Sequence, residues 1–400
     1  MKVVTIGLGY IGLPTSALIA SKSIPVHGVD INEDVVETIN QGKIHIVEPD
    51  LDTVVQLAVE KGFLKASTIP VEGDIYLIVV PTPFKGNHEP DISYVEAATR
   101  SVLPLLKSGD LYIIESTSPI GTTEQMAELI FDERPELKDR IYISYCPERV
   151  LPGNVMFELV NNDRVIGGIN EASTDAAVSF YSKIVQGELH RTNARTAEMC
   201  KLVENSSRDV QIAFANELSL ICDKANIDVW ELINLANKHP RVNILQPGSG
   251  VGGHCIAVDP YFIVSDYPNE SKMIKLARDL NNYKSKWCVE KVLKQKLLFE
   301  KDNGYSPIIA LLGLTFKPNI DDLRESPAEL IVDNLMKGSL SANYRIAEPN
   351  IDYHSRYDLV SYIEAIQESH IIVILVAHKE FQELKISKTK DVLDFCGTLK

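Results

Sequence analysis

The chain has 400 residues, of which 45% are hydrophobic and 24% are charged, and its formal net charge is −15. Because a single core stops growing at about 250–300 residues, a chain of this length is expected to form two or three domains. The acidic balance without long basic runs argues against a nucleic-acid partner, and the apolar runs are too short to span a membrane.

The N-terminal part alternates short β-rich runs with helical stretches. A helix is expected over 13–21, and strands are expected over 2–6, 26–29, 75–80, 111–115 and 141–145. Strands that alternate with helices predict a parallel, doubly wound sheet. We assign residues 1–195 to this first, Rossmann-like domain.

The pattern changes near Thr196. From there to about Lys224 the chain has no proline or glycine and carries apolar residues at helical spacing. This predicts one helix capped by Thr196, of about 28 residues and about 42 Å. A second helix is expected to start at the cap Asp228, and a third over 271–298. Residues 196–300 form the predicted central helical domain, and its long apolar helix predicts a homodimer, since such a helix must be covered.

The alternation of strands and helices resumes at Ser306. Strands are expected over 308–312, 344–347 and 371–376, which gives a second α/β domain over 301–400. The predicted fold is therefore α/β, with two Rossmann-like doubly wound domains joined by a central helical region. The second domain has Gly313 but no GxGxxG, which favours a nucleotide-sugar site over a second NAD site.

The six cysteines are widely spaced and include no CxxC pair. This predicts neither a metal site nor a disulfide framework, and it is typical of reduced thiols in a cytoplasmic protein. The N-terminus runs straight into a strand, so no signal peptide is expected. An anionic substrate would need a locally basic site on this acidic protein.

A glycine signature, Gly7-Leu8-Gly9-Tyr10-Ile11-Gly12, follows the first strand and opens a helix. Gly7 allows a tight turn, Gly9 lets the backbone approach a pyrophosphate, and Gly12 lets the helix pack close to the strand. Asp30 ends the next strand, where it would bind a ribose 2′-hydroxyl and repel a 2′-phosphate. The alternative is a turn with incidental glycines, but the preceding strand, the following helix and Asp30 together favour a dinucleotide site. Asp30 also favours NAD over NADP as the cofactor.

Three further segments carry candidate chemistry. Cys255 lies in a glycine-rich loop, where a nucleophile is more plausible than at the other five cysteines, which fit small buried side chains. Lys201 and Asn205 share one helix face and could stabilise an oxyanion, although a solvated face is the ordinary reading. Glu148 follows a strand end and is a candidate base, although most glutamates on a surface have no such role.

Seven motifs in order resemble the UDP-glucose/GDP-mannose dehydrogenase family over essentially the whole chain: GLGYIG, VPTPF, ESTSPIGTT, CPERVLPGN, AEMCKLVENS, GVGGHCIAVDP and GLTFKPNIDDLRESP. The PERVLPG form and the stretches 44–50 and 239–247 resemble the branch that acts on UDP-N-acetyl-D-mannosamine. The resemblance implies NAD-dependent four-electron oxidation of the C6 alcohol of that sugar to a carboxylate, for bacterial surface polysaccharide synthesis.

The resemblance also implies roles for matching residues. Cys255 would form a thiohemiacetal and then a thioester, with charge on the reacting oxygen stabilised by Lys201 and Asn205. Asp259 and Thr117 would hold water, and Glu148 would act as a base for hydrolysis. The implied cofactor contacts are Gly7, Gly9, Tyr10, Ile11, Gly12, Asp30, Pro81, Thr82 and Thr117, which would bind two NAD molecules in succession.

The implied contacts of the UDP-sugar substrate come from all three predicted domains. Lys317 and Arg324 would contact the UDP part, and Arg241 would reach the substrate across a dimer interface. The full set is Glu148, Arg149, Val150, Leu151, Lys201, Asn205, Arg208, His239, Arg241, Gly252, Phe316, Lys317 and Arg324.

Two departures from the family pattern argue against glucose as the sugar. Pro152 stands where relatives acting on UDP-glucose carry a glutamate, and Val258 stands where they carry a lysine. UDP-N-acetylglucosamine and UDP-glucose remain alternatives for the same chemistry. A two-electron hydroxyacid-type dehydrogenase or a non-catalytic NAD-sensing protein would not need Cys255, Lys201 and Asn205 together.

Overall fold

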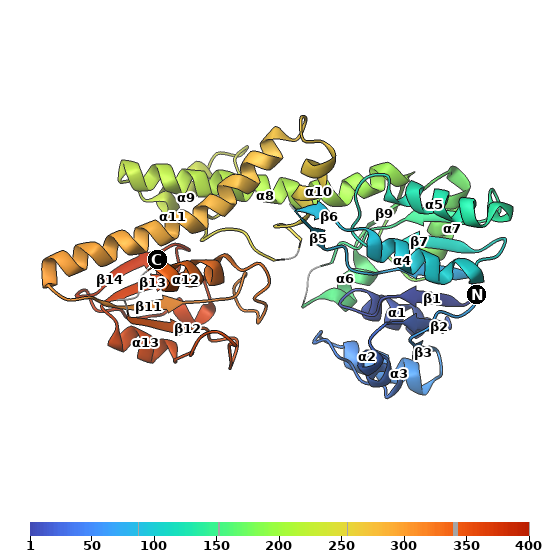
Figure 1. The fold of residues 1–400 in the computed structure, drawn as a ribbon, viewed down its shortest axis with the longest axis horizontal. Helices are drawn as coiled ribbons and strands as arrows, with labels where there is room; N and C mark the ends of the chain where they lie inside the picture. The colour runs from blue at the N-terminus through green and yellow to red at the C-terminus, as the bar shows by residue number, and fades with distance from the viewer. Residues whose placement is uncertain (87, 151–152, 254, 339–342, 400) are drawn as a thin grey trace. The chain divides into compact units, whose positions relative to one another are not determined.

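The computed structural model describes residues 1–86, 88–150, 153–253, 255–338 and 343–399. The chain forms two compact units, Met1–Val203 and Glu204–Lys400 (Figure 1). The boundary between them falls within helix α8 (Ala194–Ala225). The division into domains at residues 195 and 300 stays a prediction.

The first unit is built on an eight-stranded sheet in the order β10-β9-β8-β7-β4-β1-β2-β3. All neighbouring strands in it are parallel except β8 and β9, which run antiparallel. The strands are β1 (Val3–Ile6), β2 (Val26–Val29), β3 (Leu64–Ser67), β4 (Ile75–Ile78), β7 (Leu111–Ile114), β8 (Tyr142–Tyr145), β9 (Arg164–Gly168) and β10 (Leu189–Asn193). A small hairpin pairs β5 (Phe84–Lys85) with β6 (Glu89–Pro90).

Helices cover both faces of this sheet. Val3 of β1 packs into a cluster with residues of α1, α3 and α7, and its neighbour Val4 packs into a second cluster with residues of α4 and α5. Burial on both faces explains why the central strands β1, β4 and β7 are nearly continuous apolar runs. The helices of this unit before α8 are α1 (Gly12–Ser21), α2 (Glu33–Asn40), α3 (Leu51–Glu60), α4 (Ser93–Val102), α5 (Thr122–Glu133), α6 (Val155–Asn161) and α7 (Glu171–Tyr181), with 3-10 turns η1 (Leu103–Leu105) and η2 (Pro135–Leu137).

The second unit contains long helices and a four-stranded parallel sheet in the order β12-β11-β13-β14. Helix α11 packs with α12 on one face of this sheet, and α13 covers the other face (Figure 1). The strands are β11 (Ile308–Leu312), β12 (Asn343–Ala347), β13 (Ile371–Ile374) and β14 (Asp391–Asp394). The helices are α9 (Val229–Ala236), α10 (Asp259–Asp266), α11 (Lys272–Asn303), α12 (Pro327–Gly338) and α13 (Tyr362–Glu368), with the 3-10 turn η3 (Lys379–Phe381).

The α/β class, the two parallel sheets and the long central helices are confirmed. The cap at Asp228 is also confirmed, since its side chain accepts the N–H groups of Trp230 and Glu231. The predicted cap at Thr196 is wrong, because α8 starts at Ala194 and the side chain of Asn193 accepts the Thr196 N–H at 2.9 Å. The strand β10 thus leads into α8 without a loop. No helix in the described part of the chain is both long and apolar enough to cross a membrane.

Candidate active site

The glycine loop has the close packing that a dinucleotide site requires. Gly7 has φ +96°, and a Cβ there would lie 2.3 Å from the Val79 carbonyl oxygen. A Cβ at Gly12 would lie 1.9 Å from the Gly7 carbonyl oxygen, so α1 can start only at a glycine. A Cβ at Gly9 would meet no atom within 4 Å. The open space at Gly9, beside the first turn of α1, fits a phosphate group.

The other predicted cofactor contacts follow neighbouring strands of the same sheet. Asp30 follows β2, Pro81 and Thr82 follow β4, and Thr117 follows β7. Because β2, β1, β4 and β7 are adjacent and parallel, their carboxyl ends share one edge. Tyr10 is exposed, and Ile11, Thr82 and Thr117 are partly exposed. The structure therefore brings the predicted NAD contacts to one accessible edge.

The carboxylate of Asp30 is oriented by two backbone groups. It accepts the N–H groups of Leu8 and Asn32, both at 3.0 Å, and stays partly exposed. Burial lowers the pKa of His45, while the charge of Asp30 and the backbone of Leu8 act in the opposite direction. His45 is thus a neighbour of the glycine loop that the sequence analysis did not single out, although it lies in the 44–50 stretch.

Glu148 differs from the exposed glutamate that the sequence alone would favour. Its side chain is buried, with one oxygen 2.8 Å from Arg164 Nη1 and the other accepting the Arg149 N–H at 2.7 Å. Arg149 and Val150 are partly exposed beside it. The predicted contact Leu151, the departure Pro152 and residue His254 lie outside the described residues.

Helix α8 carries Lys201 and Asn205 one turn apart. Glu198, buried on the same helix, accepts the N–H groups of Gly121 at 2.5 Å and Thr123 at 2.8 Å. These hydrogen bonds connect α8 to the start of α5, and Glu198 lies about one turn before Lys201. Lys201 itself is partly exposed. Glu198 is a buried anchor that the motif gave no reason to select.

In the second unit, the partly exposed Cys255 leads into helix α10. Its carbonyl oxygen accepts the N–H groups of Val258 at 3.0 Å and Asp259 at 2.8 Å. Asn205 Nδ2 donates to Asp259 Oδ2 at 2.5 Å, and Asp259 is buried. The structure thus joins Asn205 and Asp259 directly and fixes the backbone of Cys255 next to that pair.

The loop before Cys255 packs against the segment that carries Phe316 and Arg324. Gly253, with φ +81°, donates its N–H to the Arg324 carbonyl at 3.0 Å. A Cβ at Gly252 would lie 2.9 Å from the Phe316 Cβ. Lys317 is exposed, and Arg324 forms an ion pair with Asp322 at 2.6 Å. Gly252, Phe316 and Arg324 therefore lie together, as a shared substrate site would require.

A buried carboxylate supports the Phe316 segment. Glu348 accepts the N–H groups of Leu314 at 2.7 Å and Thr315 at 3.2 Å, and lies 3.0 Å from His378 Nε2. Burial alone would raise the pKa of Glu348, but the bonds from His378 and the Leu314 N–H lower it overall. His378 also accepts the Asn319 N–H at 3.0 Å. This support is long-range, and no local sequence motif indicates it.

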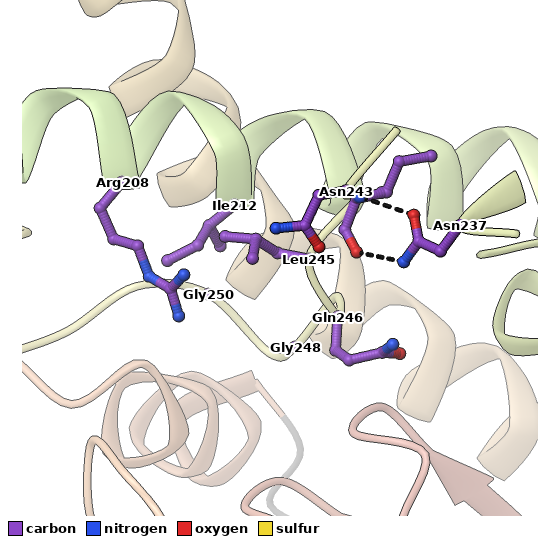
Figure 2. A pocket seen from close by; sticks show the side chains of 9 residues that line it. Arg208, Ile212, Asn237, Asn243, Leu245, Gln246, Gly248 and Gly250 are labelled. Atoms are coloured by element: carbon purple, nitrogen blue, oxygen red, sulfur yellow. Dashed lines mark hydrogen bonds between the residues drawn. The ribbon is translucent and has the colours of Figure 1, made fainter. Parts of the chain in front are cut away.

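A cavity of about 480 Å³ lies in the second unit between α8 and the chain that leads to Gly250 (Figure 2). Arg208 and Ile212 reach into it from α8, and Asn237 pairs with the backbone of Ile244 through bonds of 2.7 and 2.9 Å. Its lining residues are Arg208, Ile212, Asn237, Asn243, Ile244, Leu245, Gln246, Gly248 and Gly250. The predicted contacts His239 and Arg241 are exposed and do not belong to this lining.

Three family models match successive parts of the chain. They are the NAD binding domain of the UDP-glucose/GDP-mannose dehydrogenase family over residues 1–185, its central domain over 195–283, and its UDP binding domain over 310–399. The chain is 54% identical to a UDP-N-acetyl-D-mannosamine dehydrogenase from Campylobacter jejuni, over 99% of both chains. It is 50% identical to an NDP-N-acetyl-D-galactosaminuronic acid dehydrogenase from Ralstonia nicotianae, over 98% of this chain and 95% of the relative. A solved UDP-D-ManNAc dehydrogenase from Pyrococcus horikoshii superposes with a TM-score of 0.90 at 38% identity, covering 100% of this chain and 96% of that one.

Proposed function

The chain belongs to the UDP-glucose/GDP-mannose dehydrogenase family, and we propose that it oxidises the C6 alcohol of UDP-N-acetyl-D-mannosamine to a carboxylate. It is an NAD-dependent nucleotide-sugar 6-dehydrogenase. The choice of sugar is supported by the name of the Campylobacter jejuni relative and by the two departures at Pro152 and Val258. The galactosamine-type name of the Ralstonia nicotianae relative makes that sugar the competitor to test.

The observation that carries the four-electron chemistry is the setting of Cys255. A partly exposed thiol follows two buried glycines, and its carbonyl is fixed by the first turn of α10. The Asn205–Asp259 pair adjoins that turn. A buried packing cysteine, such as Cys222 in α8, has no comparable setting. A covalent nucleophile would keep an aldehyde attached between two oxidations.

The proposed reaction begins at the C6 alcohol of the sugar. Bound NAD would supply the oxidising power for both steps, in which the alcohol and later the Cys255 adduct would each lose a hydride and an O–H proton. Between these steps the Cys255 sulfur forms a bond to the aldehyde carbon, and the carbonyl oxygen takes a proton. Lys201 and Asn205 donate to that oxygen while it carries charge. Asn205 has two amide hydrogens, so its bond to Asp259 leaves one available.

The final step is hydrolysis of the resulting thioester. Water attacks the acyl carbon, the carbon–sulfur bond breaks, and Cys255 is released as a thiolate that regains a proton. We propose that Glu148 accepts the proton of water, and that Thr117 and Asp259 hold and orient water. Overall, one alcohol, one water and two NAD give one carboxylate, two NADH and three protons.

NAD is the proposed cofactor form, and two molecules are used in each cycle. The accessible Asp30 carboxylate, with orientation fixed by Leu8 and Asn32, suits a ribose 2′-hydroxyl and repels a 2′-phosphate. The expected contacts Gly9, Tyr10 and Thr82 lie at the same sheet edge.

Basic side chains support the binding of an anionic nucleotide sugar on this acidic protein. Lys317 and Arg324 are proposed for the UDP part, and Arg208, which lines the cavity of about 480 Å³, for another part of the substrate. The described lining contains amides and one arginine but no carboxylate. Such a lining supports the expectation that an anionic substrate needs a locally basic site on a protein with a net charge of −15.

We further propose a homodimer through α8. Phe214 and Ile221 are 50% and 56% exposed and lie seven residues apart, on one face of the helix. Arg241 is exposed and remains the proposed contact to a substrate in the partner. A reduced Cys255 is needed for the reaction, which favours the cytoplasm as the compartment.

The test is an assay of the purified protein with NAD and four UDP-sugars: those of N-acetylmannosamine, N-acetylglucosamine, N-acetylgalactosamine and glucose. We expect the highest kcat/KM for the mannosamine sugar and two NADH per sugar consumed. A site that hydrogen-bonds the distinguishing group can reject an analogue by about 10⁴-fold, while apolar fit gives only roughly 10–200-fold. A preference for UDP-glucose would contradict the sugar assignment, and one NADH per sugar would contradict the covalent mechanism.

A further inference from the structure

A group of polar side chains is buried where strands β7, β8 and β9 approach the proposed cofactor edge of the first unit. It consists of Glu115 after β7, Cys146 and Glu148 after β8, Arg164 at the start of β9, and Tyr181 at the end of α7. Arg164 is 4% exposed and Glu148 is 8% exposed. Of these residues, the proposed mechanism uses only Glu148.

The reversed direction of β9 brings Arg164 to this edge. In the antiparallel pairing of β8 and β9, Ser144 lies opposite Gly168 and Tyr145 lies opposite Gly167. Continuing that register past the end of β8 places Glu148 opposite Arg164. In a fully parallel sheet the first residue of a strand would lie at the other edge. The one reversal in the sheet therefore supplies a cation at the carboxyl ends of the parallel strands.

Three groups contact the guanidinium of Arg164. Nη1 lies 2.8 Å from Glu148 Oε2, and Nη2 donates to the Leu159 carbonyl at 3.3 Å. The guanidinium carbon lies 5.2 Å from the centre of the Tyr181 ring, whose hydroxyl donates to Glu115. The second oxygen of Glu148 accepts the Arg149 N–H. One oxygen of Glu148 is thus held by a hydrogen bond and the other by an ion pair at 2.8 Å that lacks hydrogen-bond geometry, and together they orient the carboxylate.

The charges of the group explain why the arginine is needed. A buried carboxylate without a partner is strongly unfavourable, so removing Arg164 would leave Glu148 to move or to rearrange its loop. Burial raises the pKa of Glu115 to about 7, while Arg164 opposes that rise and Glu148 adds to it. One arginine therefore acts on two carboxylates, and it forms an ion pair with Glu148 at 2.8 Å.

We propose that Arg164 is the positioning residue of Glu148, holding the carboxylate in the orientation from which it acts in thioester hydrolysis. The inference rests on the proposed function, because it assigns Arg164 a part in the same reaction. Its effect should appear at hydrolysis and not at the first hydride transfer. A pair that served only the fold would lower stability without selecting one chemical step.

The first experiment compares Arg164→Met with the unmutated enzyme. General acid–base catalysis contributes typically about 10²–10⁴-fold, so a misplaced base should lower kcat by roughly 10²-fold, with little change in the KM of the UDP-sugar. The acyl-enzyme should accumulate on Cys255, seen by mass spectrometry of quenched samples, after a normal burst of NADH. Arg134→Met is the matched control, since Arg134 binds the Leu103 and Leu106 carbonyls. It should lower stability without accumulation of the acyl-enzyme.

The second experiment is a double-mutant cycle with Glu148→Gln. If Arg164 acts through Glu148, then adding Arg164→Met to Glu148→Gln should cause no further loss in the rate of hydrolysis. Losses that multiply would overturn the inference, as would normal hydrolysis in a folded Arg164→Met protein. If Arg164→Met does not fold, the cycle is run with Arg164→Lys, which keeps the charge but not the planar fork.

The proposed function and the positioning role of Arg164 can be contradicted separately. If the proposed function is wrong, the unmutated enzyme yields one NADH per sugar or no acyl-enzyme on Cys255. If only the positioning role of Arg164 is wrong, the unmutated enzyme yields two NADH and the Arg164 variants show no selective block at hydrolysis.

Discussion

The strands β1 and β11, one in each parallel sheet, are followed by the same backbone turn, which we call the corner. Gly7 follows β1 and Gly313 follows β11, and both have φ +96°. Each donates its N–H to the last residue of the neighbouring strand at 2.8 Å, to Val29 in the first unit and to Ala347 in the second. The next residue along donates its N–H to the acid that follows that neighbouring strand.

The acids of these two corners differ in burial. Leu8 donates to Asp30 at 3.0 Å, and Leu314 donates to Glu348 at 2.7 Å. Asp30 stays partly exposed, whereas Glu348 is buried beside His378. The glycine loop of the first unit leads within five residues into α1, but the second unit inserts the Phe316–Arg324 segment before α12.

The same backbone corner therefore supports two kinds of site. In the first unit the acid is accessible and the loop is short, so a dinucleotide can approach the backbone at Gly9. In the second unit the acid holds a longer loop that carries Lys317 and Arg324. On the proposed function, the corner would fix where a ligand binds, and the loop and the burial of the acid would decide which ligand fits.

The largest effect should follow loss of the Cys255 thiol, which belongs to the second unit. Cys255→Ala should lower acid formation by roughly 10³-fold or more, because an essential nucleophile is lost, while NAD still binds to the first unit. Steady-state rates and NAD binding by calorimetry measure the two effects. Cys222→Ala is the control, since buried Cys222 should affect stability only. Near-normal turnover of Cys255→Ala would rule out the covalent mechanism.

The next effect concerns two buried acids with opposite responses to pH. Burial raises the pKa of Glu115 from 4.5 to about 7, so the unfolded chain loses this proton first, and the first unit loses stability as pH rises from about 4.5 to about 7. The loss is about 3 kcal/mol at most. The pKa of Glu348 is lowered overall, so its contribution is present above 4.5 and is lost as pH falls below that value.

Denaturant unfolding across this pH range, compared between the unmutated protein and Glu115→Gln, measures the first effect. We expect the unfolding free energy of the unmutated protein to fall relative to that of Glu115→Gln as pH rises to 7. Glu348→Gln serves as the control because its difference should change only at acidic pH. Parallel curves for the unmutated protein and Glu115→Gln would contradict the raised pKa.

Local sequence features predicted the first corner through the glycine signature and Asp30, whereas for the second they gave only Gly313 after a predicted strand. The bounds of β2 and β11 agree with expectation because each strand begins directly after a proline, Pro25 or Pro307, and ends directly before Asp30 or Gly313. The cap of α8 was missed because Asn193 also ends a strand. Arg164 and Glu348 were missed for another reason. Their partners depend on strand direction and neighbouring order, which hydrophobic periodicity does not record.

Glycine substitutions should separate the binding role of one corner from the structural role of the other. Gly313→Ala places a Cβ 2.6 Å from the Val376 Cβ at a positive φ, so it should destabilise the second unit by roughly 1–3 kcal/mol. Gly9→Ala meets no protein atom within 4 Å, so stability should stay unchanged while NAD affinity falls roughly tenfold. Thermal unfolding and NAD titration measure both. Unchanged NAD affinity in Gly9→Ala would contradict the proposal that this loop binds a phosphate of NAD.

The smallest effect should be a change of cofactor preference at Asp30. The carboxylate repels a 2′-phosphate, so Asp30→Asn should narrow the preference for NAD over NADP, by roughly tenfold in the ratio of kcat/KM values, or about 1.4 kcal/mol. Asparagine is a sharper choice than alanine because its side-chain oxygen can still accept the Leu8 N–H, which keeps the glycine loop in place.

Glu348→Gln is the matched variant at the second corner. It should leave the cofactor ratio unchanged and raise the KM of the UDP-sugar, since Glu348 holds the segment that leads to Lys317. If Glu348→Gln changed the cofactor ratio, or if the unmutated enzyme preferred NADP, the two corners would not divide cofactor and substrate binding in this way.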